Sequence, residues 1–247
     1  MAISAVGVVV PAFNEEALLP RCLDALAQAM ALLEIPNLAV VVLDDCQDGS
    51  AATVAGRRGF ETVEVRARNV GLARAAGFQA ILGWARGTPA EEVWLASTDA
   101  DSTVPEDWLS VQLEYAGQGF EAVLGTVQVI DWSERSPAVA REFADRYQAQ
   151  DEHHHVHGAN MGMTAAAYQG AGGVPPLALS EDHSLAQRLA GRHLCRTGRI
   201  PVTTSSRVVS RAVGGFAGYL DSLPAAQDHS TAAPVRRRPG SRTRSPE

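Results

Sequence analysis

Lysine is absent from this chain of 247 residues, and its 21 Lys and Arg residues are all arginine. This excludes Schiff-base chemistry on a lysine amine and phosphate-binding loops that depend on a lysine. Cysteine is scarce, because Cys22, Cys46 and Cys195 stand far apart without a Cys-x-x-Cys pair. Such spacing favours reduced thiols in the cytosol over a disulfide-bonded scaffold.

Basic charge and long apolar runs are also lacking. The formal net charge is −7, which disfavours a nucleic-acid partner. No secretory signal precedes the first apolar segment, and no apolar run approaches the roughly 20 residues that span a bilayer. We therefore expect a cytoplasmic protein, and peripheral contact with the inner membrane face stays open. The remaining composition, 46% hydrophobic and 20% charged, is that of a globular protein.

Short apolar runs rich in β-branched residues alternate with segments rich in Ala and Leu along the first half of the chain. Strands are predicted over residues 6–10, 38–43, 62–65 and 93–97. Helices are predicted over residues 17–33, over 72–85 and from 105 onward. This alternation predicts βαβ units, and hence an α/β protein with a mostly parallel central sheet flanked by helices.

The second half, about residues 116–220, is less regular. Strands are predicted over 122–130, 158–163, 195–206 and 208–209, and helices over 131–150, 164–169 and 181–190. We assign residues 1–220 to one domain with halves at about 1–115 and 116–220. From residue 221 the periodicity is lost, and five Arg and four Pro over 221–247 predict a disordered basic tail.

Two carboxylates end the strand predicted at 93–97. Asp99 and Asp101 stand two residues apart, so extended backbone would place both on one side. Such oxygen ligands suit Mg²⁺ or Mn²⁺ that also holds a diphosphate, although Asp is common in turns as well. Two other predicted strands end at Pro11-Ala12 and at Asp44-Asp45. Because ligands bind at the carboxyl ends of parallel strands, three such ends favour a binding site.

Several motifs occur in the order and spacing of a known family. They are Val-Val-Val-Pro-Ala-Phe-Asn-Glu-Glu (8–16), Leu-Asp-Asp-Cys-Gln-Asp-Gly-Ser (43–50), Arg-Asn-Val-Gly-Leu-Ala-Arg-Ala-Ala-Gly (68–77) and Thr-Asp-Ala-Asp (98–101). Later matches are Gly-Ala-Asn-Met (158–161) and Ser-Glu-Asp-His-Ser-Leu-Ala-Gln-Arg-Leu (180–189). Over about residues 5–220 the chain resembles a glycosyltransferase of family 2, with the Rossmann-like GT-A fold.

The resemblance implies a nucleotide-diphospho-sugar donor, UDP-linked more often than GDP-linked, which the first half would hold together with Mn²⁺ or Mg²⁺. The residues that it assigns to the donor are Pro11, Ala12, Glu16, Asp44, Asn69, Gly71, Arg74 and Asp99. Asp101, with Asp99, would bind the metal, and Asp182 matches the family's general base. The second half would bind a hydroxyl acceptor of unknown identity. An inverting transfer needs the base and the leaving group on opposite faces of the sugar. Asp101 and Asp182 come from different halves of the chain, which allows this arrangement.

Two other functions fit the same motifs. One is a retaining transferase of this fold, such as a hexosyl-phosphoglycerate synthase, in which Asp182 would not act as the base. The other is a nucleotide-sugar-binding protein without turnover, which the joint presence of Asp99, Asp101 and Asp182 disfavours. A dinucleotide-binding oxidoreductase is disfavoured because no Gly-x-Gly-x-x-Gly follows the first strand.

Three features of the second half bear on the acceptor. The histidine run at 153–157 suits either a transition metal or a solvated loop. Residues placed near the acceptor are His157, Asn160 and Glu181. Arg207 and Arg211 have a spacing that could hold a phosphate of donor or acceptor, or they could be exposed strand charges. The sequence identifies neither the sugar, the acceptor, a third metal ligand nor the oligomeric state.

Overall fold

The computed structural model describes residues 2–208 and 215–223. Its strands are β1 (Ala5–Ala12), β2 (Asn37–Asp44), β3 (Phe60–Val65), β4 (Val93–Ser97), β5 (Ala122–Gln128), β6 (Met161–Thr164) and β7 (Leu194–Thr203). Its helices are α1 (Leu19–Ala31), α2 (Ser50–Val54), α3 (Val70–Trp84), α4 (Trp108–Gly117), α5 (Pro137–Arg146), α6 (Ala165–Gly170), α7 (Glu181–Leu189) and α8 (Phe216–Ser222), with a short 3₁₀ turn, η1 (Ala90–Glu92).

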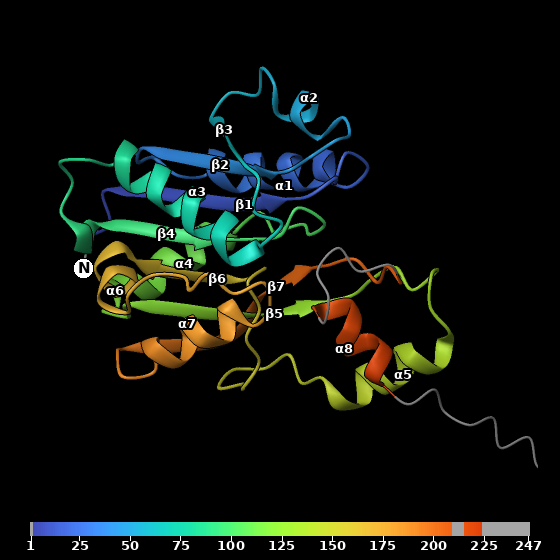
Figure 1. Ribbon diagram of the computed structural model, residues 1–247. Coiled ribbons are helices and arrows are strands. Elements are labelled where there is room, and N and C mark those ends of the chain that lie inside the picture. Colours follow the sequence, from blue (N-terminus) through green and yellow to red (C-terminus); the bar gives the residue numbers. More distant parts are fainter. Residues whose placement is uncertain (1, 209–214, 224–247) are drawn as a thin grey trace, which may run out of the picture.

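The strands form one sheet in the order β3-β2-β1-β4-β6-β5-β7 (Figure 1). β1 pairs in parallel with β2 and β4, β2 with β3, and β5 with β7. β6 runs antiparallel to its neighbours β4 and β5. The predicted α/β class with a mostly parallel sheet is therefore confirmed. Because β6 lies between β4 and β5, the sheet continues across the boundary expected near residue 115.

Helices cover both faces of the sheet, which explains why its central strands are apolar along their whole length. In β1, Val8 and Val10 pack on one face with α1 and α4, whereas Val9 packs on the other face with α3. Alternate side chains of a strand point to opposite faces, so an unbroken valine run fits a strand that is covered on both sides. The core therefore has two layers, one on each side of the sheet.

Helix α3 lies unusually close to the sheet because of a glycine. A Cβ atom built on Gly77 would come within 2.6 Å of a methyl group of Val9 and 2.8 Å of one of Val42. Any larger residue would push α3 away from β1 and β2. The helix begins at Val70, earlier than predicted, because the side chain of Asn69 caps it by accepting a hydrogen bond from the backbone N–H of Leu72.

The second half departs from prediction in three places. Helix α5 covers 137–146 rather than 131–150, and β7 ends at Thr203 rather than Ser206. The last helix, α8, includes Asp221 and Ser222, which the sequence had assigned to the tail. The rest of that tail, 224–247, lies outside the described residues. Among the residues that are described, no helix has the combination of length and apolar character that crossing a membrane requires.

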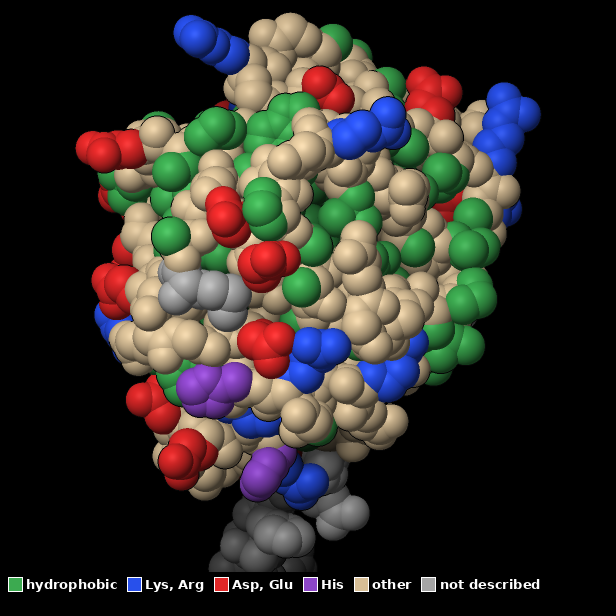
Figure 2. Space-filling view, turned by 90° about the vertical axis from the view of Figure 1, so that its left-hand side faces the viewer, with side chains coloured by type: hydrophobic (Ala, Val, Ile, Leu, Met, Phe, Trp, Pro, Cys, Tyr) green, Lys and Arg blue, Asp and Glu red, His purple; other side chains and the backbone are tan. Residues whose placement is uncertain are grey.

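The side of the molecule at the left of Figure 1 carries charges of both signs. Acidic and basic side chains are interspersed there with apolar and neutral ones (Figure 2). This mixture is typical of a solvated surface.

Candidate active site

A cleft of about 850 Å³ lies at the carboxyl ends of β1, β2 and β4. Its volume is that of a typical small-molecule site. Residues from both halves of the chain line it. The predicted site residues among them are Pro11, Ala12, Asp44, Asn69, Arg74, Asp99, Asp101, His157, Glu181, Asp182 and Arg207. The fold thus brings together residues that the sequence proposed separately for donor, metal, base and acceptor.

Asp44 organises the loop that follows β3. Its Oδ1 accepts hydrogen bonds from the backbone N–H groups of Ala67 (2.7 Å) and Arg68 (2.8 Å), and its Oδ2 accepts one from Asn69 (2.8 Å). The carboxylate is buried and stands at the end of β2. Three charge-assisted hydrogen bonds hold this loop against the cleft. The contact of Asp44 with a nucleotide base stays a prediction.

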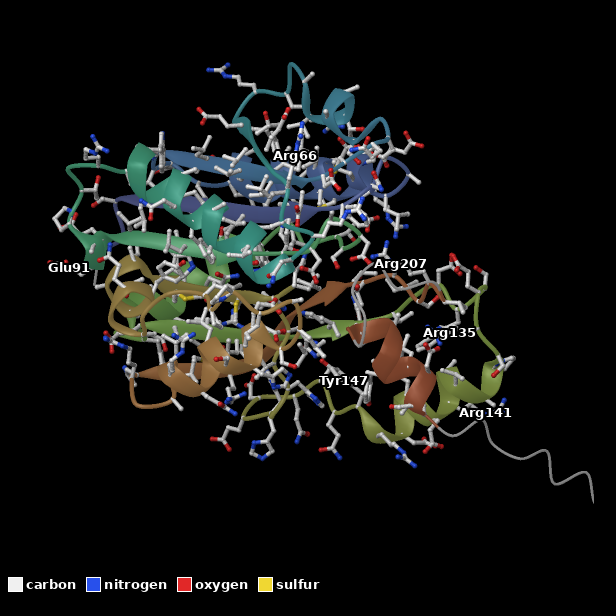
Figure 3. The ribbon with its side chains drawn as sticks, in the orientation of Figure 1. Arg66, Glu91, Arg135, Arg141, Tyr147 and Arg207 are labelled. Atoms are coloured by element: carbon white, nitrogen blue, oxygen red, sulfur yellow. The ribbon has the colours of Figure 1, made fainter. Side chains whose placement is uncertain are left out.

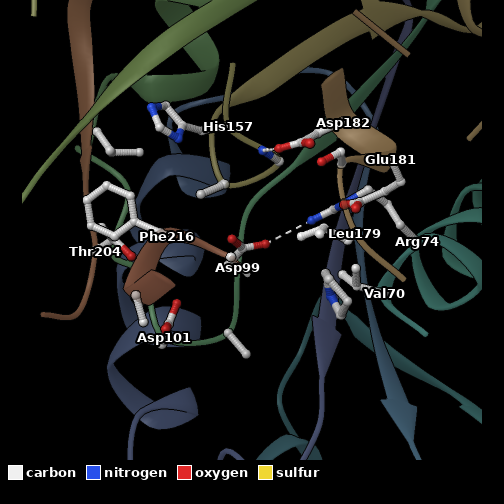
Figure 4. A pocket seen from close by; sticks show the side chains of 18 of the residues that line it. Val70, Arg74, Asp99, Asp101, His157, Leu179, Glu181, Asp182, Thr204 and Phe216 are labelled. Carbon is white, nitrogen blue, oxygen red and sulfur yellow. Dashed lines mark hydrogen bonds and ion pairs between the residues drawn. The ribbon is translucent and has the colours of Figure 1, made fainter. Parts of the chain in front are cut away.

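Arg74 is a buried arginine at the centre of the site, with only 2% of its side chain exposed. Its Nε donates to Ser97 Oγ (2.8 Å). Its Nη2 donates to Asp99 Oδ1 (2.9 Å; Figure 4), and its Nη1 pairs with Glu181. The guanidinium therefore connects the end of β4 with the first turn of α7, which carries Asp182.

Asp99 lies among other carboxylates. Its pKa is raised to about 7, first by burial in the cleft and then by the charges of Asp101, Glu181 and Asp182, whereas Arg74 opposes the rise. The side chain keeps 40% of its surface accessible within the cleft. Burial is thus the main cause of the raised pKa of Asp99, and the three neighbouring carboxylates add to it.

Asp101 and Glu15 share one arginine. Arg207 Nη2 lies 2.9 Å from Asp101 Oδ2, and Arg207 Nη1 donates to both oxygens of Glu15, at 2.7 and 2.9 Å. The hydroxyl of Ser102 donates to the other oxygen of Asp101 at 3.2 Å. Both candidate metal ligands are thus paired with an arginine of the protein, Asp99 with the buried Arg74 and Asp101 with Arg207.

Asp182 stands in the first turn of α7, on the side of the cleft that the second half of the chain forms (Figure 4). Its Oδ2 accepts a hydrogen bond from the backbone N–H of Gly158 (2.8 Å), and its Oδ1 accepts one from that of His183 (2.7 Å). Two backbone donors fix the direction of the carboxylate. The neighbouring Glu181 is buried and pairs with Arg74, so its side chain supports the site.

The histidine run forms part of an aromatic stack. Tyr147 lies between Phe143 and His155, with ring centroids 4.7 and 3.9 Å away and nearly parallel planes. The hydroxyl of Tyr147 meets His157 Nε2 at 2.8 Å. In the described part of the chain, no three or more His, Cys, Asp or Glu side chains are arranged to hold a metal ion. Three rings of the run, those of His153, His155 and His157, stack in series, and that of His155 stacks on Tyr147, whereas His154 is exposed.

Three predicted residues do not line the cleft. Glu16 accepts the backbone N–H of Gly49 (2.6 Å) and so shapes a neighbouring turn. The backbone N–H of Gly71 donates to Leu177 O (3.2 Å), which holds a loop of the second half. Asn160 is 1% exposed and lies in the core. Arg211 lies outside the described residues.

The cleft also contains residues that sequence reasoning missed. They are Glu15, Tyr147, Thr204 and Phe216. For Glu15 a signal existed, because it stands beside Glu16 in the first motif, and the two carboxylates could not be told apart by pattern. Tyr147, Thr204 and Phe216 belong to segments of the second half, and no local sequence pattern indicated that these segments reach the cleft.

The residues fit a divalent cation that is held jointly with a diphosphate. Six carboxylates and three arginines line the cleft, so acidic groups outnumber basic ones before a donor adds its own charge. Asp99 and Asp101 would supply hard oxygen ligands. Mg²⁺ is commonly bound by one or two carboxylates together with substrate phosphates, so this site needs no third protein ligand.

The chain has clear relatives by family and by fold. A family model described as "Glycosyl transferase family 2" matches residues 7–170. S. aureus TarS 1–349 in complex with UDP-GlcNAc superposes with a TM-score of 0.63 at 15% identity, over 87% of this chain and 62% of that one. Mannosyltransferase PcManGT from Pyrobaculum calidifontis, in complex with GDP-Man and Mn²⁺, superposes with a TM-score of 0.53 at 20% identity, over 78% and 56%.

These likenesses confirm the predicted GT-A fold. The chain spans about three fifths of the length of TarS 1–349 and of PcManGT, and 37% of the longer TarS structure. No curated protein matches it in sequence.

Proposed function

The chain belongs to glycosyl transferase family 2, and on that premise we propose that it transfers a sugar from a nucleotide-diphospho-sugar to a hydroxyl group of an acceptor. We propose a UDP-linked donor ahead of a GDP-linked one, dependence on Mn²⁺ or Mg²⁺, and inversion of the anomeric carbon. One observation carries the proposal: a single cleft holds Asp99 and Asp101 from the first half and Asp182 from the second.

The donor assignment has support from proteins of the same fold. The TarS structures include complexes with UDP-GlcNAc and with UDP, and PcManGT is in complex with GDP-Man and Mn²⁺. Both nucleotides therefore occur with this fold. In the present chain, the residues at the ends of β1 and β2 and the loop held by Asp44 would bind the nucleoside, because they line the cleft beside the Asp99–Asp101 pair.

The metal would be held by Asp99 and Asp101. When bound, such a cation neutralises negative charge that develops on the leaving diphosphate. Asp182 would take the proton of the acceptor hydroxyl, which makes the oxygen a better nucleophile. The backbone N–H groups of Gly158 and His183 hold its carboxylate in one orientation. Arg74 keeps the first turn of α7 fixed relative to Asp99.

The experiment distinguishes loss of the general base from loss of donor binding, because it measures transfer and donor binding separately. Asp182→Asn keeps the size of the side chain and removes its basicity, so donor binding should stay at the wild-type level. Transfer should fall about 10²- to 10⁴-fold, the usual contribution of a general base. Release of UDP or GDP from UDP- and GDP-sugars would be followed with Mn²⁺ and a panel of hydroxyl acceptors, and donor binding by calorimetry. Asp145→Asn, an exposed carboxylate on α5, is the matched control.

Near-native turnover in Asp182→Asn would show that another group takes the proton. The anomeric configuration of the product then decides between the two enzyme classes, because a retained configuration identifies the retaining alternative. Absence of turnover and of nucleotide binding in the folded wild-type protein would contradict the proposed function.

A further inference from the structure

Arg207 follows β7, and a long-range bridge brings it to the Asp99–Asp101 pair. The backbone N–H of Thr103 donates to Thr203 O (2.8 Å), and that of Thr203 donates to Thr103 O (3.0 Å). The hydroxyl oxygens of Ser102 and Thr204 lie 3.0 Å apart, within hydrogen-bond distance. The segment after Asp101 and the segment before Arg207 are therefore paired side by side.

The backbone around Arg207 is anchored by a second arginine. Arg135 Nε donates to Ser206 O (2.7 Å), and Arg135 Nη2 donates to Arg207 O (2.9 Å). Figure 3 shows both arginines at the same end of the molecule, near α8. Only 5% of the Arg135 side chain is exposed. The main chain at Arg207 is thus fixed, while its long side chain can turn about its own bonds.

The side chain of Arg207 holds two carboxylates at the mouth of the site. It pairs with Asp101 through Nη2 and with Glu15 through Nη1, and 19% of it is exposed. The pairing with Asp101 matters because that carboxylate is the proposed metal ligand. A carboxylate oxygen that pairs with a guanidinium is less available to a metal ion, so the two cations compete for it.

The other arginines of the cleft are placed differently. Arg74 is buried, and its guanidinium already has three partners. Arg68 pairs with Asp45 at 2.6 Å and is 68% exposed, at the nucleoside side of the cleft. Arg207 is therefore the arginine that is both next to the metal-binding carboxylates and accessible from the cleft.

We propose that Arg207 is a binding residue for the donor diphosphate, and that it exchanges Asp101 for diphosphate oxygens when Asp101 takes up a divalent cation. This inference rests on the proposed function. The guanidinium fork matches phosphate oxygens in geometry and charge. The exchange replaces an arginine–carboxylate pair by two pairs of opposite charge, one between Asp101 and the metal and one between Arg207 and the diphosphate. Glu15 remains as a second partner that keeps Arg207 at the cleft.

The first experiment measures Mn²⁺ binding to the full chain without nucleotide, by calorimetry. Arg207→Ala frees Asp101 from its competitor, so Mn²⁺ should bind about five- to tenfold more tightly than to the wild type. Arg68→Ala is the matched control, because it removes one positive charge from the same cleft and leaves the Arg207–Asp101 pair intact. An equal gain in Mn²⁺ affinity in the two variants would show that only the net charge of the cleft matters, and would overturn the proposed exchange.

The second experiment compares UDP with UMP in saturating Mn²⁺, and GDP with GMP likewise. Arg207→Ala should weaken binding of the diphosphate roughly 10- to 100-fold and leave the monophosphate nearly unchanged. Arg207→Lys keeps the charge without the fork and should lose part of the preference for the diphosphate, which gives a readout if Arg207→Ala fails to fold. An unchanged preference in both variants overturns the diphosphate contact.

The failures are distinguishable. If the wild type binds no nucleotide with Mn²⁺, the proposed function is wrong, and this inference falls with it. If the wild type binds a nucleoside diphosphate with Mn²⁺ but the Arg207 variants behave like the wild type, the proposed function stands and the inference alone is wrong.

Discussion

His157 shows how one half-buried side chain in the wall of the cleft is held in a single protonation state. The Tyr147 hydroxyl oxygen accepts the backbone N–H of Val127 (2.9 Å) and lies 2.8 Å from His157 Nε2, within hydrogen-bond distance. Burial lowers the pKa of His157 to about 3, although Asp182 opposes this shift. The ring in the wall of the cleft is therefore neutral at physiological pH.

This pKa predicts a dependence of stability on pH. In the unfolded chain a histidine takes up its proton near pH 6.5, whereas His157 in the folded chain takes it up near pH 3. Above pH 6.5 the histidine is neutral in both states, so it does not reduce the stability of the fold. As the pH falls from 6.5 towards 3, only the unfolded chain takes up the proton, and the folded state loses stability relative to it. Between about pH 7.5 and pH 5, His157 should lower the free energy of unfolding by up to about 2 kcal/mol. Urea unfolding of the wild type and of His157→Gln at both pH values measures it.

His157→Gln should lose the part of the pH dependence of stability that His157 causes, because glutamine does not titrate. His154→Gln is the control, since His154 is an exposed residue of the same run. A wild-type pH dependence in His157→Gln would show that the folded protein accepts a proton on His157 without cost.

At this scale the sequence indicated which carboxylates line the cleft better than it indicated the residues that hold them. Asp99 and Asp101 were singled out because they end a predicted strand, and Asp182 because it matches a family motif; all three line one cleft, and their roles stay predictions. Asn160 was misplaced, because it belongs to a family motif and yet accepts Trp108 Nε1 and donates to the carbonyl oxygens of Thr126 and Ile200. A motif does not separate residues that touch a ligand from residues that hold strands together.

At the scale of elements, the start of α3 supports a loop of the second half. Asn69 Nδ2 donates to Pro176 O (3.3 Å), and the backbone N–H of Gly71 donates to Leu177 O (3.2 Å). A Cβ on Gly71 would lie 2.5 Å from the carbonyl oxygens of Pro175 and Leu177. Since both obstacles are backbone atoms, the loop itself would have to move.

Gly71→Ala should therefore loosen the loop at 172–180 while α3 stays folded. Hydrogen exchange of peptides from this loop, measured by mass spectrometry, should become about tenfold faster or more. Gly83→Ala on the same helix is the control, because nothing lies within 4 Å of its Cβ position. That variant should stabilise the protein by up to about 1 kcal/mol without affecting the loop. Unchanged exchange in Gly71→Ala would mean that the loop is not seated on α3 in solution.

Elements with clear periodicity were predictable, and the strand at 93–97 coincides with β4. Helix α5 was predicted too long because aromatic residues at 132, 143 and 147 looked like anchors on one helix. In the structure, Trp132 and Tyr147 flank the helix and pack onto Phe143 from outside it, with centroids 5.4 and 4.7 Å away. Apolar contacts across a helix end leave no periodic signal.

At the scale of the whole molecule, the cleft depends on a sheet that both halves build. The antiparallel β6 joins β4 to β5, and the bridge between Thr103 and Thr203 brings the second half to the Asp99–Asp101 pair. The sequence predicted the α/β class because parallel strands alternate with helices. It could not show this bridge, since two threonines 100 residues apart carry no pattern that links them.

Because both halves meet at the cleft, donor binding should stabilise the whole fold. At a nucleoside diphosphate concentration of about 100 times Kd, binding contributes about 2.7 kcal/mol, which raises Tm by roughly 5–10 °C for a chain of this size. Scanning calorimetry with UDP or GDP, in Mn²⁺ and then in EDTA, measures this rise. The wild type should show it with Mn²⁺ and lose most of it in EDTA.

Asp101→Ala should remove the difference between Mn²⁺ and EDTA, because the carboxylate that would hold the metal is gone. Any residual rise should be equal in both conditions, since Arg207, released from Asp101, can still meet the diphosphate without a metal. Asp107→Ala, an exposed carboxylate just before α4, should behave like the wild type. A full metal-dependent rise in Asp101→Ala would place the metal on other residues, and both the role of Asp101 and the exchange with Arg207 would then have to be abandoned.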